Sequence, residues 1–164
     1  MLTIRDADNQ DAEAIWQIFQ AVVAGGDTYV FAPDTPRAEA LAYWFSPTTR
    51  TYVAANASRV VGTYILRPNR PGLGSHVANA AFMVSPDARG LGVGRTMGEH
   101  CLAEARGLGY RAMQFNFVVS TNESAVRLWQ RLGFGIVGTL PGAFRHATKG
   151  FVDVYVMFRS LEED

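Results

Sequence analysis

The sequence has 164 residues, of which 48% are hydrophobic, and its 15 Lys and Arg are balanced by 15 Asp and Glu. This composition is typical of one globular domain with a sizeable core, so we expect a single domain over residues 1–164 and exclude a disordered chain. The balanced charge also excludes a protein that coats nucleic acid through a surplus of cations.

Hydrophobic periodicity and turn residues predict strands and helices along the whole chain. Strands are expected at residues 2–5, 51–55, 60–67, 76–84, 112–119, 134–140 and 151–158, and helices at 12–25, 36–45, 93–108 and 122–132. Hairpins come first and strand–helix–strand crossovers follow. This order indicates an α/β (α+β) fold, with a mixed sheet of about seven strands and helices on both faces. Asn122 stands where a side chain would cap the last helix.

Several partners are not expected from the sequence. Cys101 is the only cysteine, which excludes an internal disulfide and a cysteine-based zinc site and favours the cytoplasm; we expect no metal. No run approaches 18 apolar residues, and the first residues lack a basic segment followed by an apolar one. We therefore expect neither a signal peptide nor a membrane partner.

A glycine-rich loop lies between a buried strand and a helix and holds Gly90, Gly92 and Gly94. Glycines allow close backbone approach, and a helix start presents unpaired N–H groups at the positive end of its dipole. Arg89 and Arg95 add charge, so the loop predicts a pyrophosphate site. A glycine-rich turn that only packs closely is the alternative. The spacing matches neither a dinucleotide-binding loop nor a P-loop.

The loop, Arg89-Gly90-Leu91-Gly92-Val93-Gly94, resembles the acetyl-CoA motif of the GNAT superfamily of N-acetyltransferases, [Gln/Arg]-x-x-Gly-x-[Gly/Ala]. Residues 122–134 are similar to the next motif of that superfamily, an Asn, then Ala, then Leu-Tyr, then Gly-Phe. The element order is similar too, so the resemblance covers nearly the whole chain. Sequence around Asn79 and Asn116 is also similar to fungal acetyltransferases that act on proline analogues such as azetidine-2-carboxylate.

The resemblance implies a centrally splayed sheet and an enzyme that uses acetyl-CoA as co-substrate. Backbone amides of the glycine loop would bind the CoA pyrophosphate, and the strand ending at Val84 would pair with the pantetheine arm. A backbone N–H near Met83 or Val84 would polarise the thioester carbonyl. Asn122 would contact the CoA arm, unless it only caps its helix. The implied cofactor-binding set is Met83, Val84, Arg89, Gly90, Leu91, Gly92, Val93, Gly94, Arg95, Asn122 and Trp129.

One position departs from the family pattern. The usual Tyr of the second motif, a proposed general acid for the leaving thiolate, is Trp129 here. An indole N–H donates hydrogen bonds but is not a proton donor at neutral pH. Tyr155, Cys101 or water would then supply the proton, or the thiolate would leave unaided.

Asn79 and Asn116 each interrupt an otherwise apolar strand. A buried amide without partners costs about 1–3 kcal/mol, so each side chain must find hydrogen bonds. These bonds could lie within the protein. The alternative is that both face the splayed gap, bind a polar substrate and orient the attacking amine, directly or through water. We expect them to be catalytic and substrate-binding.

The acceptor pocket is expected from two loops. Residues 26–33 carry Tyr29 and Phe31, which would either bind substrate or pack beneath the loop. Residues 142–150 carry Arg145, which could pair with an acceptor carboxylate or remain a solvated charge. The first 40 residues hold seven acids and two bases, so we expect an acidic surround for a cationic acceptor.

The sequence therefore predicts an acetyl-CoA-dependent N-acetyltransferase. Its acceptor would be the primary or secondary amine of a small molecule, an amino acid or a toxic analogue, attacking directly in a ternary complex. The alternatives are acetylation of protein N-termini or lysines, and a non-catalytic acyl-CoA-binding module. Apolar residues at 152–158 need cover, which favours a homodimer.

Overall fold

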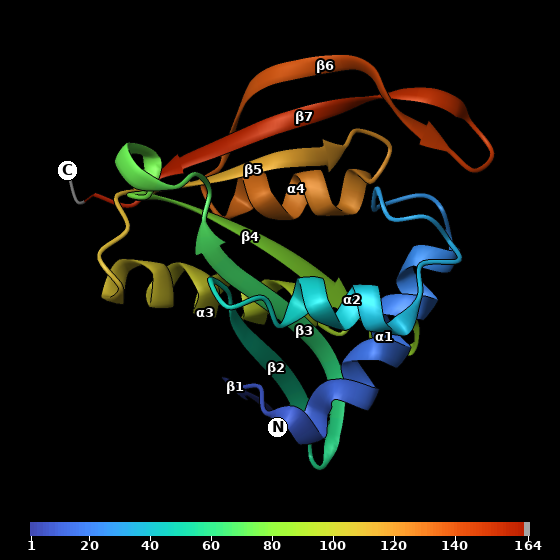
Figure 1. The fold of residues 1–164 in the computed structure, drawn as a ribbon. Coiled ribbons are helices and arrows are strands. Elements are labelled where there is room, and N and C mark those ends of the chain that lie inside the picture. Colours follow the sequence, from blue (N-terminus) through green and yellow to red (C-terminus); the bar gives the residue numbers. More distant parts are fainter. Residues whose placement is uncertain (163–164) are drawn as a thin grey trace.

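The computed structural model describes residues 1–162 and contains the elements in the predicted order (Figure 1). The strands are β1 (Leu2–Asp6), β2 (Arg50–Asn56), β3 (Arg59–Pro68), β4 (Val77–Val84), β5 (Ala112–Val119), β6 (Gly135–His146) and β7 (Gly150–Ser160). The helices are α1 (Ala12–Ala24), α2 (Arg37–Trp44), α3 (Val93–Gly107) and α4 (Glu123–Arg131), with short 3-10 turns η1 (Asn9–Asp11), η2 (Gly72–Gly74) and η3 (Pro86–Ala88). No helix within residues 1–162 is long and apolar enough to cross a bilayer.

The seven strands form one mixed sheet in the order β1-β2-β3-β4-β5-β7-β6. All neighbours are antiparallel except β4 and β5, which are parallel. These two strands pair only at Val77↔Ala112 and Ala78↔Met113 and then separate. The predicted central splay is confirmed, and it leaves β4 without a strand partner on that side from Asn79 to Val84.

Helices cover both faces of the sheet, as the sequence predicted. Helices α1 and α2 pack on one face in a core that includes Phe19, Trp44 and Met83. Helices α3 and α4 pack on the other face in a core that includes Cys101 and Trp129. Alternate side chains of β4 enter the two cores, because successive residues of a strand point to opposite faces.

The last hairpin differs from the prediction. Residues 142–150 were expected to form a polar loop, but β6 continues to His146 and the turn is short. The pairing of β6 with β7 shifts between Leu140 and Phe144, around Pro141 and Gly142. Since β6 is an edge strand, proline and glycine there interrupt the ladder without ending it. Gly142 has φ +58°, and its N–H donates to the Asp153 carboxylate at 3.0 Å.

Candidate active site

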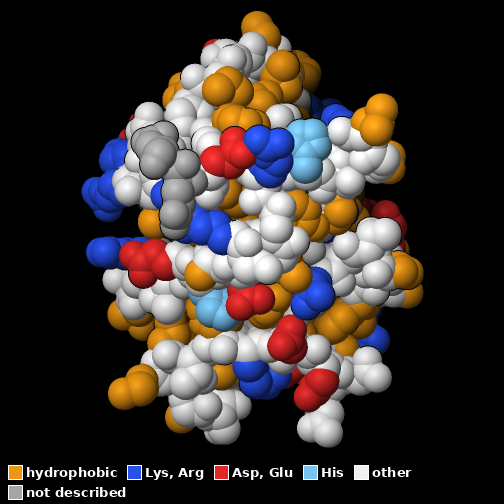
Figure 2. Space-filling view, turned by 90° about the vertical axis from the view of Figure 1, so that its left-hand side faces the viewer, with side chains coloured by type: hydrophobic (Ala, Val, Ile, Leu, Met, Phe, Trp, Pro, Cys, Tyr) orange, Lys and Arg blue, Asp and Glu red, His pale blue; other side chains and the backbone are white. Residues whose placement is uncertain are grey.

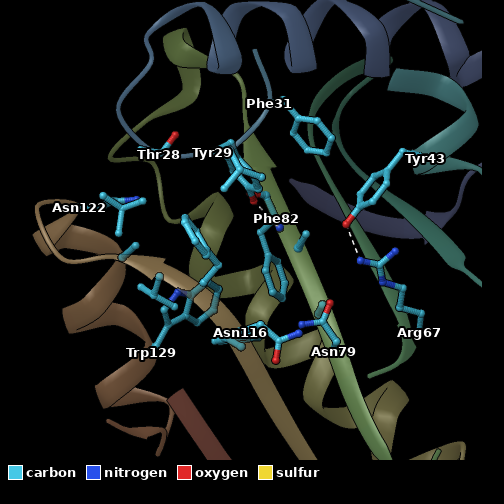
Figure 3. Close-up of a pocket in the computed structure, with 18 residues that line it drawn as sticks. Thr28, Tyr29, Phe31, Tyr43, Arg67, Asn79, Phe82, Asn116, Asn122 and Trp129 are labelled. Atoms are coloured by element: carbon cyan, nitrogen blue, oxygen red, sulfur yellow. Dashed lines mark hydrogen bonds between the residues drawn. The ribbon is translucent and has the colours of Figure 1, made fainter. Parts of the chain in front are cut away.

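A cavity of about 310 Å³ opens where β4 and β5 separate (Figure 3). Its walls come from the loop between α1 and α2, from α2, from the end of β3, from β4 and β5, and from α4. Six side chains that the sequence singled out line it together: Tyr29, Phe31, Asn79, Asn116, Asn122 and Trp129. The splay therefore brings residues separated by up to a hundred positions into one site.

Asn79 keeps a hydrogen-bond acceptor for a ligand. Its side chain is 9% exposed, and its Nδ2 donates to the main-chain oxygen of Gln114 on β5 at 3.0 Å. Within residues 1–162, no hydrogen bond reaches its Oδ1. This oxygen lines the cavity side of the bridge between the strands, where it can accept from an amine or a water.

Asn116 is bonded within the protein on both sides of its amide. Its Nδ2 donates to Asn69 Oδ1 at 2.6 Å, and its Oδ1 accepts from Gln114 Nε2 at 2.9 Å. Figure 3 shows Asn79 and Asn116 side by side at one end of the cavity. Asn116 lines the same space, yet its amide is already satisfied.

Tyr29 enters from the opposite side and covers the main chain of β4. Its hydroxyl accepts from the Phe82 N–H at 3.0 Å and donates to the Phe82 carbonyl oxygen. Burial raises the pKa of the phenol, so Tyr29 stays protonated. The main-chain groups of Phe82 therefore face the open edge of β4 inside the cavity.

The alternation of β4 places the main-chain groups of the two predicted thioester donors, Met83 and Val84, on opposite sides of the strand. Phe82 faces the open edge, whereas the Ser85 N–H donates to Val61 of β3 at 2.8 Å. In an antiparallel ladder the main-chain groups of successive residues point to opposite sides. Val84 thus faces the open edge and Met83 faces β3, with its side chain in the core beneath α1. Neither lines the cavity.

The glycine loop ends in an open helix start. Gly92 is the N-cap residue of α3 with φ +78°, and no side chain caps the helix. The N–H groups of Val93, Gly94 and Arg95 therefore lack partners within the helix. A Cβ at Gly92, or at Gly90 with φ +77°, would meet nothing within 4 Å. These two glycines serve the backbone conformation and do not pack closely.

Two arginines flank this helix start. The Arg95 guanidinium donates to Glu99 at 2.8 Å on the helix surface, and both side chains are exposed. Arg89 precedes the two left-handed glycines in an extended conformation. Leu91, between them, is 72% exposed, so the loop is open to solvent.

Asn122 and Trp129 form the α4 wall of the cavity. Asn122 holds the N-cap position, but its side chain makes no capping bond and instead accepts from the Ser124 hydroxyl at 3.3 Å. The prediction that this side chain caps α4 is wrong: Asn122 has φ −81° and ψ 65°, outside the extended conformation usual for a capping residue. Trp129 packs its ring 4.8 Å from those of Phe82 and Phe115. It forms an apolar wall.

Most other candidates for proton transfer lie outside the cavity. His100 bonds to the Tyr64 hydroxyl through Nδ1 at 2.7 Å, and Tyr155 packs against the core on the α3 side. Cys101 is fully buried, and burial raises the pKa of its thiol, so it is neither an acid nor a nucleophile here. Among residues 1–162, no group of three or more His, Cys, Asp or Glu could hold a metal ion.

The structure adds two residues that sequence reasoning missed, Arg67 and Tyr43. Arg67 lines the cavity from the end of β3, and Tyr43 lines it from α2 (Figure 3). The only sequence signal was a charge at the end of an apolar strand. Arg145 is exposed on β6 and does not line the cavity, and neither does any acid of the first 40 residues. The first 40 residues contribute Thr28, Tyr29, Val30 and Phe31 to the cavity wall and no acid.

A splayed mixed sheet, with a cavity in the splay and an uncapped helix start beside it, is the architecture that the motifs predicted for an acetyl-transferring enzyme. The profile of the acetyltransferase (GNAT) family matches residues 12–134. The chain belongs to this family.

Known proteins agree with this assignment. A GCN5-related N-acetyltransferase from Kribbella flavida superposes with a TM-score of 0.93 and 45% identity, covering 97% of both chains. N-acetyltransferase aca1 of Schizosaccharomyces pombe is 38% identical over 108 residues, which are 63% of this chain and 52% of that protein. The chain thus matches about half the length of aca1. A phosphinothricin acetyltransferase from Sinorhizobium meliloti, solved with AcCoA, shares the fold with a TM-score of 0.85 and 24% identity over 99% of this chain and 89% of that one.

Proposed function

We propose that the protein transfers the acetyl group of acetyl-CoA to the primary or secondary amine of a small molecule, an amino acid or a toxic analogue of one. The observation that carries the proposal is the cavity between β4 and β5. It joins the open edge of β4 to a space whose mostly apolar wall carries the polar side chains of Arg67, Asn79 and Asn116. This arrangement suits a thioester that enters along the edge and an amine that approaches from the α1–α2 side.

The residues on the CoA side fit the co-substrate. Unpaired N–H groups at the start of α3, together with two left-handed glycines, suit a pyrophosphate. The edge of β4 beyond the splay offers main-chain groups at Val84 and Phe82, which suit an amide-containing arm. The S. meliloti relative solved with AcCoA supports this choice.

The reaction forms a carbon–nitrogen bond, breaks a carbon–sulfur bond and releases one proton from the amine. The neutral amine nitrogen attacks the thioester carbon, the carbon–sulfur bond breaks, and the CoA thiolate leaves. The Phe82 N–H is an open-edge donor inside the cavity, and it would stabilise the negative charge on the carbonyl oxygen once the Tyr29 hydroxyl moves aside. Asn79 Oδ1 would orient the amine, and the proton would pass to water.

None of the side chains that the sequence offered as an acid for the leaving thiolate is placed to act. Trp129 cannot supply a proton, and Cys101 and Tyr155 lie outside the cavity. We therefore favour departure of the thiolate unaided or with a proton from water. We also propose that the amine attacks directly in a ternary complex. A covalent acetyl-enzyme would need an activated serine or cysteine, and none lines the described cavity.

Acetylation of protein lysines or N-termini is less well supported. Such acceptors come as cationic peptides, which favour acidic surroundings. The charged side chain that lines this cavity within residues 1–162 is an arginine, and the cavity holds about 310 Å³. A small amine fits this volume better than a peptide.

The test is thiol release from acetyl-CoA with a panel of amines, amino acids, proline analogues and lysine peptides. We expect release with small amines and little with peptides. Release with peptides alone would favour protein acetylation. No release with any acceptor, with acetyl-CoA still bound, would favour the acyl-CoA-binding module.

We also propose a homodimer. Ile136, Val137 and Leu140 on β6 and Phe151 on β7 are exposed hydrophobic side chains on the outer hairpin. Figure 2 shows hydrophobic side chains gathered at the top of the molecule, where Figure 1 places β6 and β7. A second copy would cover this edge of the sheet. Sedimentation equilibrium tests it: a monomer at micromolar concentration would contradict the proposal.

The cytoplasm is the location we propose. Its support is Cys101, a buried free thiol with no second cysteine to pair with. Such a thiol is typical of reducing compartments. Fractionation of the producing cells, followed by detection of the protein, tests this location.

A further inference from the structure

We propose that Arg67 binds an anionic group of the acceptor, so that the substrates are amines carrying a carboxylate, or a group of the same charge, close to the nitrogen. This inference rests on the proposed function, because it names the acceptor class of the same cavity. It follows from the charge, the anchoring and the sheet register of Arg67.

The first observation is an uncompensated charge. Arg67 is the charged side chain among the residues that line the cavity. The ion pairs formed within residues 1–162 join other residues, and none includes Arg67. A half-buried guanidinium without a carboxylate is costly unless a ligand or solvent satisfies it. An anionic ligand in the cavity would do so.

The second observation is that Tyr43 anchors Arg67 and leaves most of its N–H donors free. Its guanidinium carbon lies 4.7 Å from the centre of the Tyr43 ring, and one terminal nitrogen donates to the Tyr43 hydroxyl. Arginine has five N–H donors, and this contact uses one. The rest can form the bidentate pair that a carboxylate accepts. Tyr43 is thus the positioning residue for Arg67.

The third observation is the register of β3 and β4, which sets the spacing. Arg67 lies directly opposite Asn79 in the antiparallel pair. Opposite residues point to the same face, and their Cβ atoms lie about 5 Å apart. One small molecule can therefore contact the guanidinium with its acid and Asn79 Oδ1 with its nitrogen. This spacing suits α- and β-amino acids and their cyclic analogues better than long diamines.

The experiment compares matched acceptors with matched variants. L-Proline and L-alanine are assayed beside L-prolinamide and L-alaninamide, which lack the charge, in wild type, Arg67→Met and Arg67→Lys. Arg131→Met is the control, because Arg131 is an exposed arginine on α4 that does not line the cavity. Thiol release gives kcat and KM for each pair.

We expect wild type to prefer the amino acids over their amides. Arg67→Met should raise KM for the amino acids about tenfold or more, the usual scale for loss of a charged hydrogen-bonded pair. It should change KM for the amides less than threefold, which a purely structural role would not do. Arg67→Lys should recover part of the loss, and Arg131→Met should match wild type.

Two results would overturn the inference. One is equal use of acids and amides by wild type. The other is an equal loss for both acceptors in Arg67→Met. In both cases thiol release would continue, so the proposed acetyl transfer would stand.

If wild type acetylates no member of the panel, a measurement of ligand binding tests the inference instead. N-acetyl-L-proline with CoA should raise the melting temperature of wild type more than N-acetyl-L-prolinamide does, and this difference should vanish in Arg67→Met. Its absence from wild type would overturn the inference as well.

Discussion

The hydroxyl of Tyr29 bonds to both main-chain groups of Phe82, accepting from its N–H at 3.0 Å and donating to its carbonyl oxygen. Tyr29 lies on the loop between α1 and α2, whereas Phe82 lies on the open edge of β4. One hydroxyl thus takes the place that a neighbouring strand would otherwise fill. A co-substrate that pairs with this edge at Phe82 must displace the hydroxyl or share the site with it.

Tyr29→Phe should therefore destabilise the free protein more than the acetyl-CoA complex. The change leaves a buried N–H and carbonyl without partners, which costs about 1–3 kcal/mol. In a chain of this size that lowers the melting temperature by roughly 2–10 °C. Bound acetyl-CoA supplies partners for the edge, so it should raise the melting temperature of Tyr29→Phe more than that of wild type.

Tyr110→Phe is the control, because no hydrogen bond of the Tyr110 hydroxyl is found within residues 1–162 and the ring packs beside the α3 core. It should change both melting temperatures little. Equal losses for free and bound Tyr29→Phe would show that Tyr29 stays on Phe82 during binding.

Asn79→Ala should lower kcat by about 10- to 100-fold, the scale on which misplaced reactants slow enzymes. The reason is loss of the free Oδ1 that would orient the amine. The KM for acetyl-CoA should stay within about twofold of wild type. Asn116→Ala should lower kcat less and the melting temperature more, since both sides of its amide are bonded to Asn69 and Gln114. The opposite order would make Asn116 the residue that contacts substrate.

The sequence predicted the sheet and helices well because each depends on local pattern. The helix over α1 follows from apolar residues at helical spacing, and the loop before α3 from its glycines. The strand predicted at residues 134–140 ends too early, because Pro141 and Gly142 are residues that usually end a strand. Their tolerance depends on β6 lying at the edge of the sheet, which local pattern does not reveal.

The site could be predicted only in part for a similar reason. Asn79 and Asn116 were visible because a polar residue interrupts an apolar strand. The difference between them depends on the hydrogen bonds of Asn116 with Gln114 and Asn69, and Asn69 lies 47 positions away in the sequence. Arg67 was missed because its place beside the site depends on the strand register that sets it opposite Asn79.

Gly92→Ala should weaken CoA binding by about tenfold, which corresponds to roughly 1.4 kcal/mol. Gly92 has φ +78°, a conformation that costs an L-residue about 1–2 kcal/mol. Relief of that strain would turn the N–H groups at the start of α3 away from the pyrophosphate. Isothermal titration with CoA measures the change.

Gly107→Ala is the matched control in the last turn of the same helix. A Cβ there meets nothing within 4 Å, and its backbone is outside the left-handed region. Alanine should leave CoA affinity unchanged and stabilise the helix by up to about 1 kcal/mol. Unchanged affinity in Gly92→Ala would remove the pyrophosphate assignment from this loop.

Acid should unfold the protein partly through Asp11, which ties β1 to the start of α1. Its carboxylate accepts two hydrogen bonds from Arg5, at 2.7 and 2.8 Å, and one from the Asp8 N–H at 2.9 Å. The bond from Arg5 is the main cause that lowers the pKa of Asp11 below its ordinary 3.8, and burial opposes it. The folded state favours the ionised carboxylate. The contribution of Asp11 to the stability of the folded protein is therefore complete above about pH 4, and it is lost as the pH falls through the lowered pKa.

Asp11→Asn should therefore be less stable than wild type at pH 7 by about 1–3 kcal/mol, the scale of hydrogen bonds to a charged group. The two proteins should converge as the pH falls below 4, because protonated Asp11 loses the same interaction. Urea unfolding between pH 2.5 and 7 measures this. Asp87→Asn, whose carboxylate pairs with Arg59 on the surface, should show a much smaller difference at pH 7. A constant gap between Asp11→Asn and wild type across the whole range would mean that the charge of Asp11 does not carry its effect.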